Sequence, residues 1–178
     1  CFEKVAKKVI KDASIPVGIE VLYDMPATLK LAHKIGADFV RFDVFSDDMV
    51  TKWGTVYAKG KSLVRANTNM GTPKTFIPAD VHVKHTTLAK QKSLTDSRQD
   101  TDLLGSDAMI LTGNWTGVAP ELQDLLSARA ATLKPIIIGS GLNDANAKLL
   151  LPYAHGAIVG SSIKTNGVID FDKACKLV

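Results

Sequence analysis

The sequence predicts an α/β fold of the (β/α)8 TIM-barrel type, with residues 1–178 forming a single, partial barrel domain. Short apolar runs alternate with amphipathic helical segments, an order that produces a parallel sheet. The last two predicted strands are each followed by a turn of glycine and serine, which favours a barrel. The chain has only 178 residues, whereas a complete barrel of this type needs about 250.

Six segments are predicted to be strands, because they are rich in Val, Ile and Phe and most are bounded by Gly or Pro. Nearly continuous apolar stretches such as residues 136–138 are typical of parallel strands that helices cover. The predicted strands are residues 16–22, 39–44, 76–81, 108–112, 135–138 and 157–159.

Helical segments lie between these strands. Asp24 is suited to cap the start of one helix and Gly36 to end it, while Pro120 and Glu121 suit the first turn of another. Asn143 or Asp144 is expected to cap a later helix. The predicted helices are residues 2–11, the segment between Asp24 and Gly36, and residues 61–69, 94–104, 120–131, 145–151 and 171–177.

The two glycine-rich turns predict a phosphate site. Glycine lets the backbone come close to an oxyanion, to which free amides and serine hydroxyls can donate hydrogen bonds. A doubly wound sheet also fits the alternation, but barrels often bind phosphate in the loops after their last two strands. The alternative is that these glycines only make tight turns. The turns are Gly139, Ser140 and Gly141, and Gly160, Ser161 and Ser162.

A polar cluster follows the predicted strand at residues 76–81. In an extended strand Asp80, His82 and Lys84 share one face, which in a barrel points into the mouth. We expect His82 to be the general acid or base, with Asp80 orienting it and Lys84 stabilising negative charge. Asp80, His82 and His85 also suit a divalent metal, although the sequence establishes no cofactor. The alternative is a structural hydrogen-bond network.

Four further polar residues lie near the ends of predicted strands. Arg41 and Asp43 share a strand face, Glu20 precedes the end of the first strand, and Thr112 ends the fourth. Asp43 joins the catalytic candidates, and the other three are candidates for the barrel mouth. Each is either a site residue or a structural cap.

The composition is mildly basic, with 22 Lys and Arg against 18 Asp and Glu and a net charge of +4. The sequence has no basic run and no interleaving of basic and aromatic residues, so we expect no nucleic-acid partner. Trp53 and Trp115 are interpreted as packing residues. Cys1 and Cys175 form no metal-binding spacing, and the longest uncharged stretch near the C-terminus, residues 149–163, is too short to span a membrane. We therefore expect a cytoplasmic protein.

These motifs resemble the BtpA/SgcQ family of (β/α)8-barrel proteins. The similarity follows the chain in order over nearly its whole length, and its most specific part is Asp-Val-His-Val-Lys-His at residues 80–85. The matching stretches are residues 16–22, 36–41, 49–51, 53–54, 79–85, 106–113, 139–141 and 156–162.

The resemblance implies likeness to the ribulose-phosphate-binding barrels, with phosphate at the two glycine-rich turns and residues 80–85 in the mouth. One branch of the family is linked to photosystem I biogenesis and another lies among sugar-utilisation genes. We therefore expect a protein that binds a phosphorylated small molecule, such as a phosphosugar isomerase, aldolase or related enzyme. The alternative is a non-catalytic assembly or stability factor, associated peripherally with a membrane complex such as photosystem I.

This chain departs from the family in three places. The family often has Asn at the positions of Glu20 and Asp43, so the two carboxylates change the charge of the mouth. The family also begins with two more βα units, and Cys1 falls within what would be the second helix. Without these two units, a gap is expected between the strands at residues 16–22 and 157–159. The two strand edges at this gap are unpaired, which favours association, so we expect a homo-oligomer.

Overall fold

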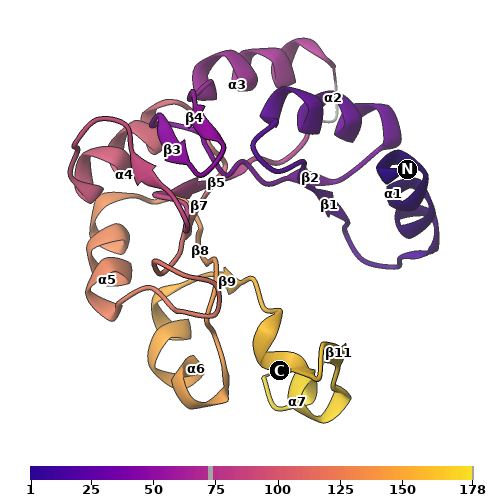
Figure 1. Ribbon diagram of the computed structural model, residues 1–178, viewed down its shortest axis with the longest axis vertical. Coiled ribbons are helices and arrows are strands. Elements are labelled where there is room, and N and C mark those ends of the chain that lie inside the picture. Colours follow the sequence, from indigo (N-terminus) through magenta and orange to yellow (C-terminus); the bar gives the residue numbers. More distant parts are fainter. Residues whose placement is uncertain (72–73, 178) are drawn as a thin grey trace.

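The computed structural model describes residues 1–71 and 74–177, in which helices and strands alternate along an open arc (Figure 1). The parallel strands line the inner side of the arc, and helices α1 to α6 lie on its outer side. The arc is open between its first and last strands. The structure thus confirms a (β/α)8-type fold in the form of a partial barrel.

Six parallel strands follow one another around the arc in chain order, as successive βα units of a barrel do. The second and third are joined by backbone hydrogen bonds: the Val40 amide donates to the Phe76 carbonyl at 2.9 Å, and the Phe42 amide to the Pro78 carbonyl at 3.1 Å. The strands are β1 (Gly18–Ile19), β2 (Phe39–Val40), β5 (Pro78–Val81), β7 (Ala108–Leu111), β8 (Ile136–Ile138) and β9 (Gly156–Ala157).

Each predicted helix is present, with shifts at its ends. Pro120 lies outside its helix, because Glu121 is the N-cap, and Asn143 caps the following helix. Within the described part of the chain, no helix has the length and apolar character needed to cross a membrane. The helices are α1 (Phe2–Asp12), α2 (Met25–Ile35), α3 (Gly60–Asn69), α4 (Leu94–Leu103), α5 (Leu122–Ala131), α6 (Asp144–Leu150) and α7 (Phe171–Cys175), with 3-10 turns η1 (Leu151–Tyr153) and η2 (Ser161–Ile163).

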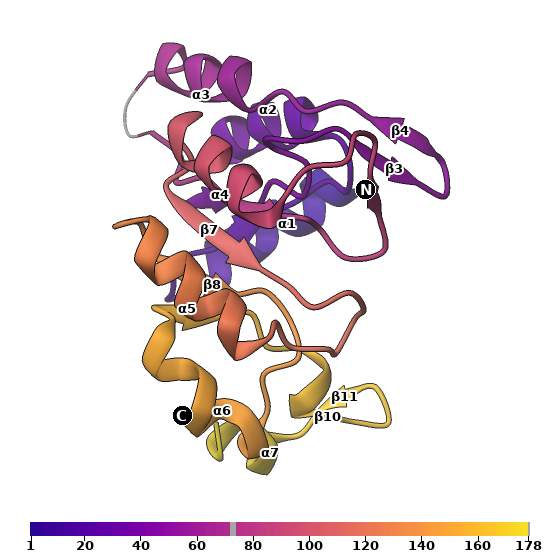
Figure 2. The same ribbon diagram turned by 90° about the vertical axis from the view of Figure 1, so that its left-hand side faces the viewer.

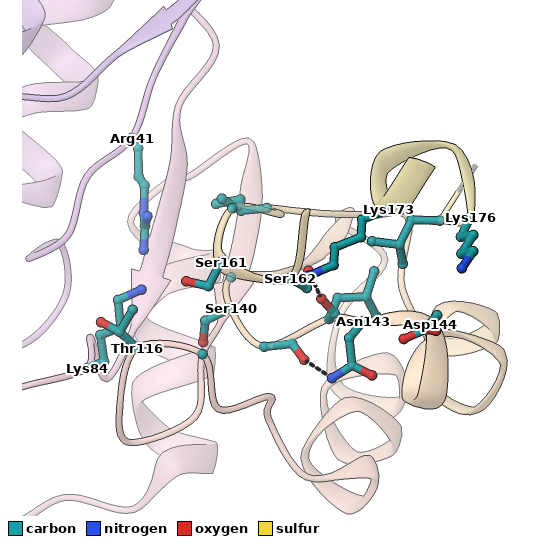
Figure 3. Close-up of a pocket in the computed structure, with 17 residues that line it drawn as sticks. Arg41, Lys84, Thr116, Ser140, Asn143, Asp144, Ser161, Ser162, Lys173 and Lys176 are labelled. Carbon is teal, nitrogen blue, oxygen red and sulfur yellow. Dashed lines mark hydrogen bonds between the residues drawn. The ribbon is translucent and has the colours of Figure 1, made fainter. Parts of the chain in front are cut away.

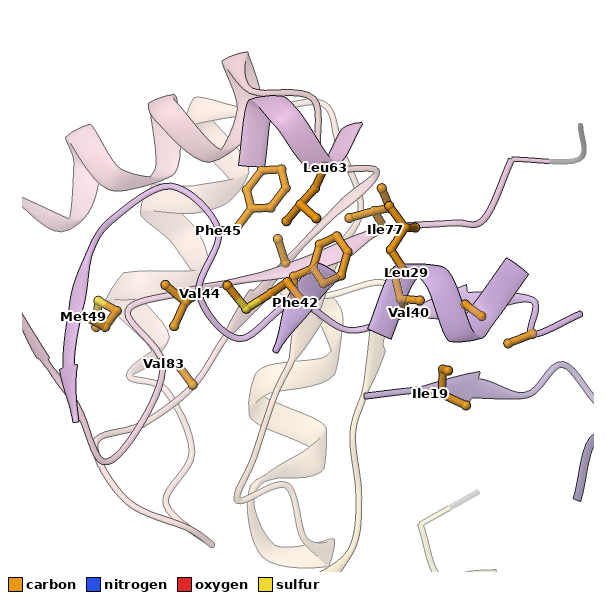
Figure 4. Close-up of a cluster of buried hydrophobic side chains, with 14 of the residues drawn as sticks. Ile19, Leu29, Val40, Phe42, Val44, Phe45, Met49, Leu63, Ile77 and Val83 are labelled. Carbon is orange, nitrogen blue, oxygen red and sulfur yellow. The ribbon is translucent and has the colours of Figure 1, made fainter. Parts of the chain in front are cut away.

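The core forms where the inner strands meet the outer helices. Figure 4 shows Phe42 and Phe45 beside Leu63 of α3, with Leu29 of α2 and Ile77 close by. The two phenylalanine rings stack with their centroids 6.3 Å apart, and both are fully buried. A second apolar cluster lies under α5 and α6. These clusters hold the carboxyl ends of the strands in place, where the loops of a barrel build its site.

Two antiparallel elements lie outside the βα repeat and were not predicted. β3 (Met49–Thr51) pairs with β4 (Gly54–Val56) and with β6 (Thr87–Leu88), and β10 (Lys164–Thr165) pairs with β11 (Val168–Ile169). Figure 2 shows both on the side toward which β7 points. The parallel strands are also shorter than predicted, because an apolar run counts as strand only where it is paired: the ladder between β1 and β2 joins only Gly18 to Phe39 and Ile19 to Val40.

Asp24 contributes a testable share of the stability of α2. Its side chain accepts a hydrogen bond of 3.0 Å from the Ala27 amide, and Gly36 ends the helix with a φ of 72°. Replacing Asp24 by Ala is expected to lower the free energy of unfolding by about 1 kcal/mol, and replacing it by Asn by much less. Urea unfolding followed by circular dichroism measures both, and equal losses would contradict the capping role.

Candidate functional site

The two glycine-rich turns meet at one cavity of about 650 Å³, at the carboxyl ends of β8 and β9. All six residues of the predicted phosphate site line it, although some twenty residues separate the two turns in the chain. Figure 3 shows Ser140, Ser161 and Ser162 in its middle, with Arg41 and Lys84 toward one end and Lys173 and Lys176 toward the other. We call this the turn cavity.

Hydrogen bonding in the turns differs from the expectation for the serines. The Ser140 hydroxyl donates to the Val118 carbonyl at 2.7 Å, and the Ser162 hydroxyl donates to the Leu142 carbonyl at 2.6 Å. These hydroxyl protons are therefore used within the chain. The amides of Ser140, Gly141, Gly160 and Ser161 donate to no group in residues 1–71 and 74–177. Backbone amides are thus the available donors for an anion.

Glycine is required at two positions of the first turn. A Cβ at Gly139 would lie 2.5 Å from side-chain carbons of Ile110 and Thr112. Gly141 has a φ of 72°, and a Cβ there would lie 2.1 Å from the amide nitrogen of Ala119. The loop before α5 therefore packs directly on the turn, which holds its amides in a fixed direction.

Two lysines of the turn cavity were missed by sequence reasoning. Lys173 lies on α7 and Lys176 directly follows it, and both line the cavity together with Lys84 and Arg41. The available signal was their spacing of three residues, which places them on one face of the predicted C-terminal helix. Four basic side chains against the single acidic residue Asp144 make the cavity suited to an anion.

A larger cavity of about 1270 Å³ adjoins the turn cavity. It lies among the loops that follow β1, β2 and β5, and Arg41 and Lys84 line both cavities. We call it the mouth cavity. Of the predicted mouth residues it contains Glu20, Arg41, Asp43, His82, Lys84 and His85.

Arg41 and Asp80 form a buried ion pair between β2 and β5. The Arg41 Nε and Nη2 atoms donate to the two Asp80 carboxylate oxygens at 2.7 and 2.8 Å. The Asp80 side chain is fully buried. Burial raises the pKa of the Asp80 carboxyl, and the hydrogen bonds and charge of Arg41 counter this effect. Asp80 therefore positions Arg41 at the boundary between the two cavities.

Glu20 and Asp43 bring two further carboxyls to the mouth cavity. Asp43 is buried and accepts a hydrogen bond of 2.8 Å from the Tyr23 amide. Glu20 has its Oε2 atom 3.9 Å from Arg41 Nη1. Burial raises the pKa of the Glu20 carboxyl from 4.5 to about 7, although the charge of Arg41 acts in the opposite direction. Glu20 is thus a carboxyl that exchanges its proton near neutral pH.

The expected shared face of Asp80, His82 and Lys84 is not present. The β5 strand ends at Val81, and His82 has a φ of 55°, so the alternation of faces stops there. His82 shares a hydrogen bond of 2.8 Å with the Ser97 hydroxyl of α4, and burial lowers the pKa of its ring. The prediction that Asp80 orients His82 is wrong, because the His82 ring is held by Ser97, while both oxygens of Asp80 bond to Arg41.

His85 and Thr112 also have local partners. His85 shares a hydrogen bond of 2.8 Å with the Thr116 hydroxyl, and the Thr112 hydroxyl donates to the His82 carbonyl at 3.4 Å. Thr112 lines neither cavity and instead holds the backbone at His82. The metal set formed by Asp80, His82 and His85 is not assembled, and no group of three such ligands occurs among the residues that the structure describes.

Comparison with known proteins agrees with the fold and with the sequence motifs. The sequence model of the BtpA family matches residues 1–178. The chain belongs to the BtpA family. It is 36% identical over 169 residues to an uncharacterized protein of Pyrococcus abyssi, covering 93% of this chain and 64% of that protein. It is 37% identical over 158 residues to the photosystem I biogenesis protein BtpA of Synechocystis, covering 87% of this chain and 55% of that protein. This BtpA-family chain therefore spans less than two thirds of either relative.

Two of the solved structures similar to this BtpA-family chain are named for phosphorylated compounds. A 3-hexulose-6-phosphate synthase superposes with a TM-score of 0.65 at 18% identity, covering 98% of this chain and 78% of its own. The (S)-3-O-geranylgeranylglyceryl phosphate synthase of Thermoplasma acidophilum, solved with sn-glycerol-1-phosphate, has a TM-score of 0.64 at 12% identity and covers 99% and 73%. At these identities the likeness establishes the fold alone.

Proposed function

We propose that this chain binds a phosphorylated small molecule, with its phosphate in the turn cavity. The observation that carries this proposal is that all six residues of two turns distant in sequence line one cavity. Four of their amides are free to donate, and four basic side chains surround them. Fixed amides and several cations are the means by which proteins hold a phosphate dianion. The similar structures, which are named for phosphorylated compounds, support this choice.

We further propose proton-transfer chemistry of the isomerase or aldolase type beside the bound phosphate. Arg41 and Lys84 lie at the boundary of both cavities, where they would stabilise negative charge that develops on a substrate oxygen. Glu20 lines the mouth cavity close to Arg41 and is the carboxyl suited to exchange a proton. His82 and Asp43 lie in the same cavity as further acid–base candidates. Asp80 acts through Arg41.

Binding of inorganic phosphate and ribose 5-phosphate tests the turn cavity. We expect Lys84→Met and Lys173→Met, made separately, each to weaken binding about tenfold, because each removes one charged contact to the phosphate. The two lysines approach the cavity from opposite ends, so both effects together place the ligand between them (Figure 3). Isothermal titration calorimetry measures the change.

Lys148→Met is the matched control, since Lys148 is an exposed residue of α6 outside the cavity lining. It is expected to bind both probes as the unaltered chain does. If the unaltered chain binds neither probe, the proposed function is wrong. Equal losses of affinity in all three variants would show that binding depends on the net charge of the chain and not on the turn cavity.

A second candidate is a role in assembling a membrane complex, for which the name of the Synechocystis relative is the supporting observation. This role predicts binding to a protein partner without any effect of phosphorylated compounds. A thermal-shift series with phosphosugars separates the two, because a ligand bound only by the folded state raises the melting temperature.

A further inference from the structure

The mouth cavity combines polar and charged groups with a large apolar and aromatic surface, which the basic turn cavity lacks. About 1270 Å³ is large enough for a metabolite of considerable size, since ligand pockets commonly measure about 300–1,000 Å³. A sugar alone would leave the apolar and aromatic part of this surface uncovered. Six of the apolar and aromatic lining residues are Leu22, Tyr23, Met49, Val50, Trp53 and Trp115.

The two tryptophans of the chain, interpreted from sequence as packing residues, both line this cavity. Trp53 is 67% exposed and Trp115 is 63% exposed, so neither is buried in the core. Each has one aromatic neighbour in an edge-to-face arrangement: Tyr23 lies 5.9 Å from Trp53, and His85 lies 5.2 Å from Trp115. Large aromatic side chains exposed inside a concave surface are typical of ligand sites.

The loop after β7 joins this aromatic surface to the phosphate site. Asn114 and Trp115 line the mouth cavity, whereas the next two residues, Thr116 and Gly117, line the turn cavity. The hydrogen bond between Thr116 and His85 fixes the loop at this point. Arg41 and Lys84 also belong to both cavities. A single molecule with its phosphate in the turn cavity would therefore extend toward Trp115.

We propose that the phosphorylated ligand carries a planar heteroaromatic ring at its other end, as a nucleoside monophosphate does, and that this ring stacks on Trp115. This inference rests on the proposed phosphate-binding function and names the class of ligand held there. Proteins that bind single-stranded nucleic acids without sequence preference hold each base by stacking it on an aromatic side chain.

A heteroaromatic ring fits the lining better than an aliphatic chain does. Gln91, Thr87 and Asn114 are exposed residues of the same lining, and their side chains make no hydrogen bond within the described residues. The edge of a heteroaromatic ring offers these groups donors and acceptors. An aliphatic chain would remove them from water and leave them unpaired, which is unfavourable.

Calorimetric titration of the 178-residue chain with AMP, CMP, ribose 5-phosphate and geranyl phosphate tests the proposal. We expect at least one nucleotide to bind about tenfold more tightly than ribose 5-phosphate, as one stacked ring can provide. Trp115→Leu should abolish this preference while leaving the affinity for ribose 5-phosphate unchanged. Because Trp115 is exposed, this variant is expected to fold. Trp53→Phe leaves Trp115 as the sole tryptophan, whose fluorescence gives a direct measurement of quenching by the nucleotide.

The outcomes separate the two proposals. If ribose 5-phosphate binds as tightly as the nucleotides, the phosphate site stands and the ring proposal is overturned. Tighter binding of geranyl phosphate than of any nucleotide would overturn it in favour of an aliphatic ligand. If none of the four compounds binds, the proposed function itself fails, and the ring proposal with it.

Discussion

Replacing Arg41 by Ala is expected to lower the free energy of unfolding by about 3–5 kcal/mol, the largest single effect that we predict. The reason is the carboxyl that the substitution leaves behind. The Asp80 side chain is fully buried, and both of its oxygens bond to Arg41 at 2.7 and 2.8 Å. Urea unfolding at pH 7, followed by circular dichroism, measures the loss.

The loss should depend on pH in a defined direction. Burial already raises the pKa of Asp80, and Arg41 is the main group that opposes this, with a smaller contribution from the charge of Lys84. Without Arg41 the pKa of Asp80 in the folded state rises further above that in the unfolded state. The variant therefore loses stability as pH increases from the unfolded-state pKa to the folded-state pKa of Asp80. The difference from the unaltered chain is therefore largest near neutral pH and shrinks toward acid pH, where Asp80 is protonated and needs no counterion.

Two controls isolate the unpaired charge. Arg65→Ala removes an exposed arginine of α3 and should change stability by no more than about 0.5 kcal/mol. Asp80→Asn combined with Arg41→Ala leaves a neutral amide in place of the carboxylate and should recover part of the loss. A destabilisation by Arg41→Ala that does not change with pH would refute the role assigned to Asp80.

The ion pair shows why local sequence patterns predicted the fold better than the site. Arg41 and Asp80 were each recognised as candidate site residues, but Asp80 was predicted to orient His82, two residues away. The actual partner lies 39 residues away on another strand, a distance over which periodicity carries no information. The same limit applies to Lys173 and Lys176, which reach the turn cavity only through the packing of α7.

Features that one short segment determines were predicted well. Asp24 and Gly36 bound α2 as expected, since a cap and a left-handed glycine act within a few residues. The two glycine-serine turns were located because glycine is needed where the backbone is crowded, as at Gly141. The backbone conformation of His82 was not predicted, because a left-handed conformation in a residue other than glycine has little sequence signal.

The tryptophans illustrate a different limit. From sequence, a large apolar side chain is expected in the core, and Trp53 and Trp115 were interpreted in that way. Trp53 follows β3, in the antiparallel sheet that interrupts the βα repeat. That sheet could not be foreseen from the repeat, and it places the side chain at the mouth cavity instead of the core.

Replacing Glu20 by Gln is expected to stabilise the fold by about 1–3 kcal/mol at pH 8 and to leave its stability nearly unchanged at pH 4. Burial raises the pKa of the Glu20 carboxyl from 4.5 to about 7 in the folded state. Between these values the folded chain binds more protons than the unfolded chain, so this group reduces stability as pH increases. Gln does not titrate, and the variant therefore lacks this contribution.

Urea unfolding of both proteins from pH 4 to pH 8 gives the measurement, because other titrating groups contribute equally to the two curves. Glu121→Gln, which removes a carboxylate at an exposed position, is the matched control, and it should not reproduce the gain in stability at pH 8. The chain contains only Glu3, Glu20 and Glu121, so carbon-13 labelling of glutamate resolves the Glu20 carboxyl directly by NMR. Unfolding curves that stay parallel across this range, with a Glu20 resonance that titrates near pH 4.5, would contradict the prediction.

The result also bears on the proposed chemistry. A carboxyl whose pKa is about 7 is protonated in about half of the molecules at neutral pH, so it can both donate and accept a proton during one reaction cycle. Asp43 shares the cavity but is engaged by the Tyr23 amide, and Asp80 is held by Arg41. Glu20 is therefore the carboxyl whose ionisation should change when a phosphorylated ligand binds. A dianion bound near Arg41 would compete with Glu20 for the positive charge of Arg41 and would raise the pKa of Glu20 further. Ligand binding at pH 7 should therefore take up protons. Calorimetry in buffers of different ionisation enthalpy detects this uptake.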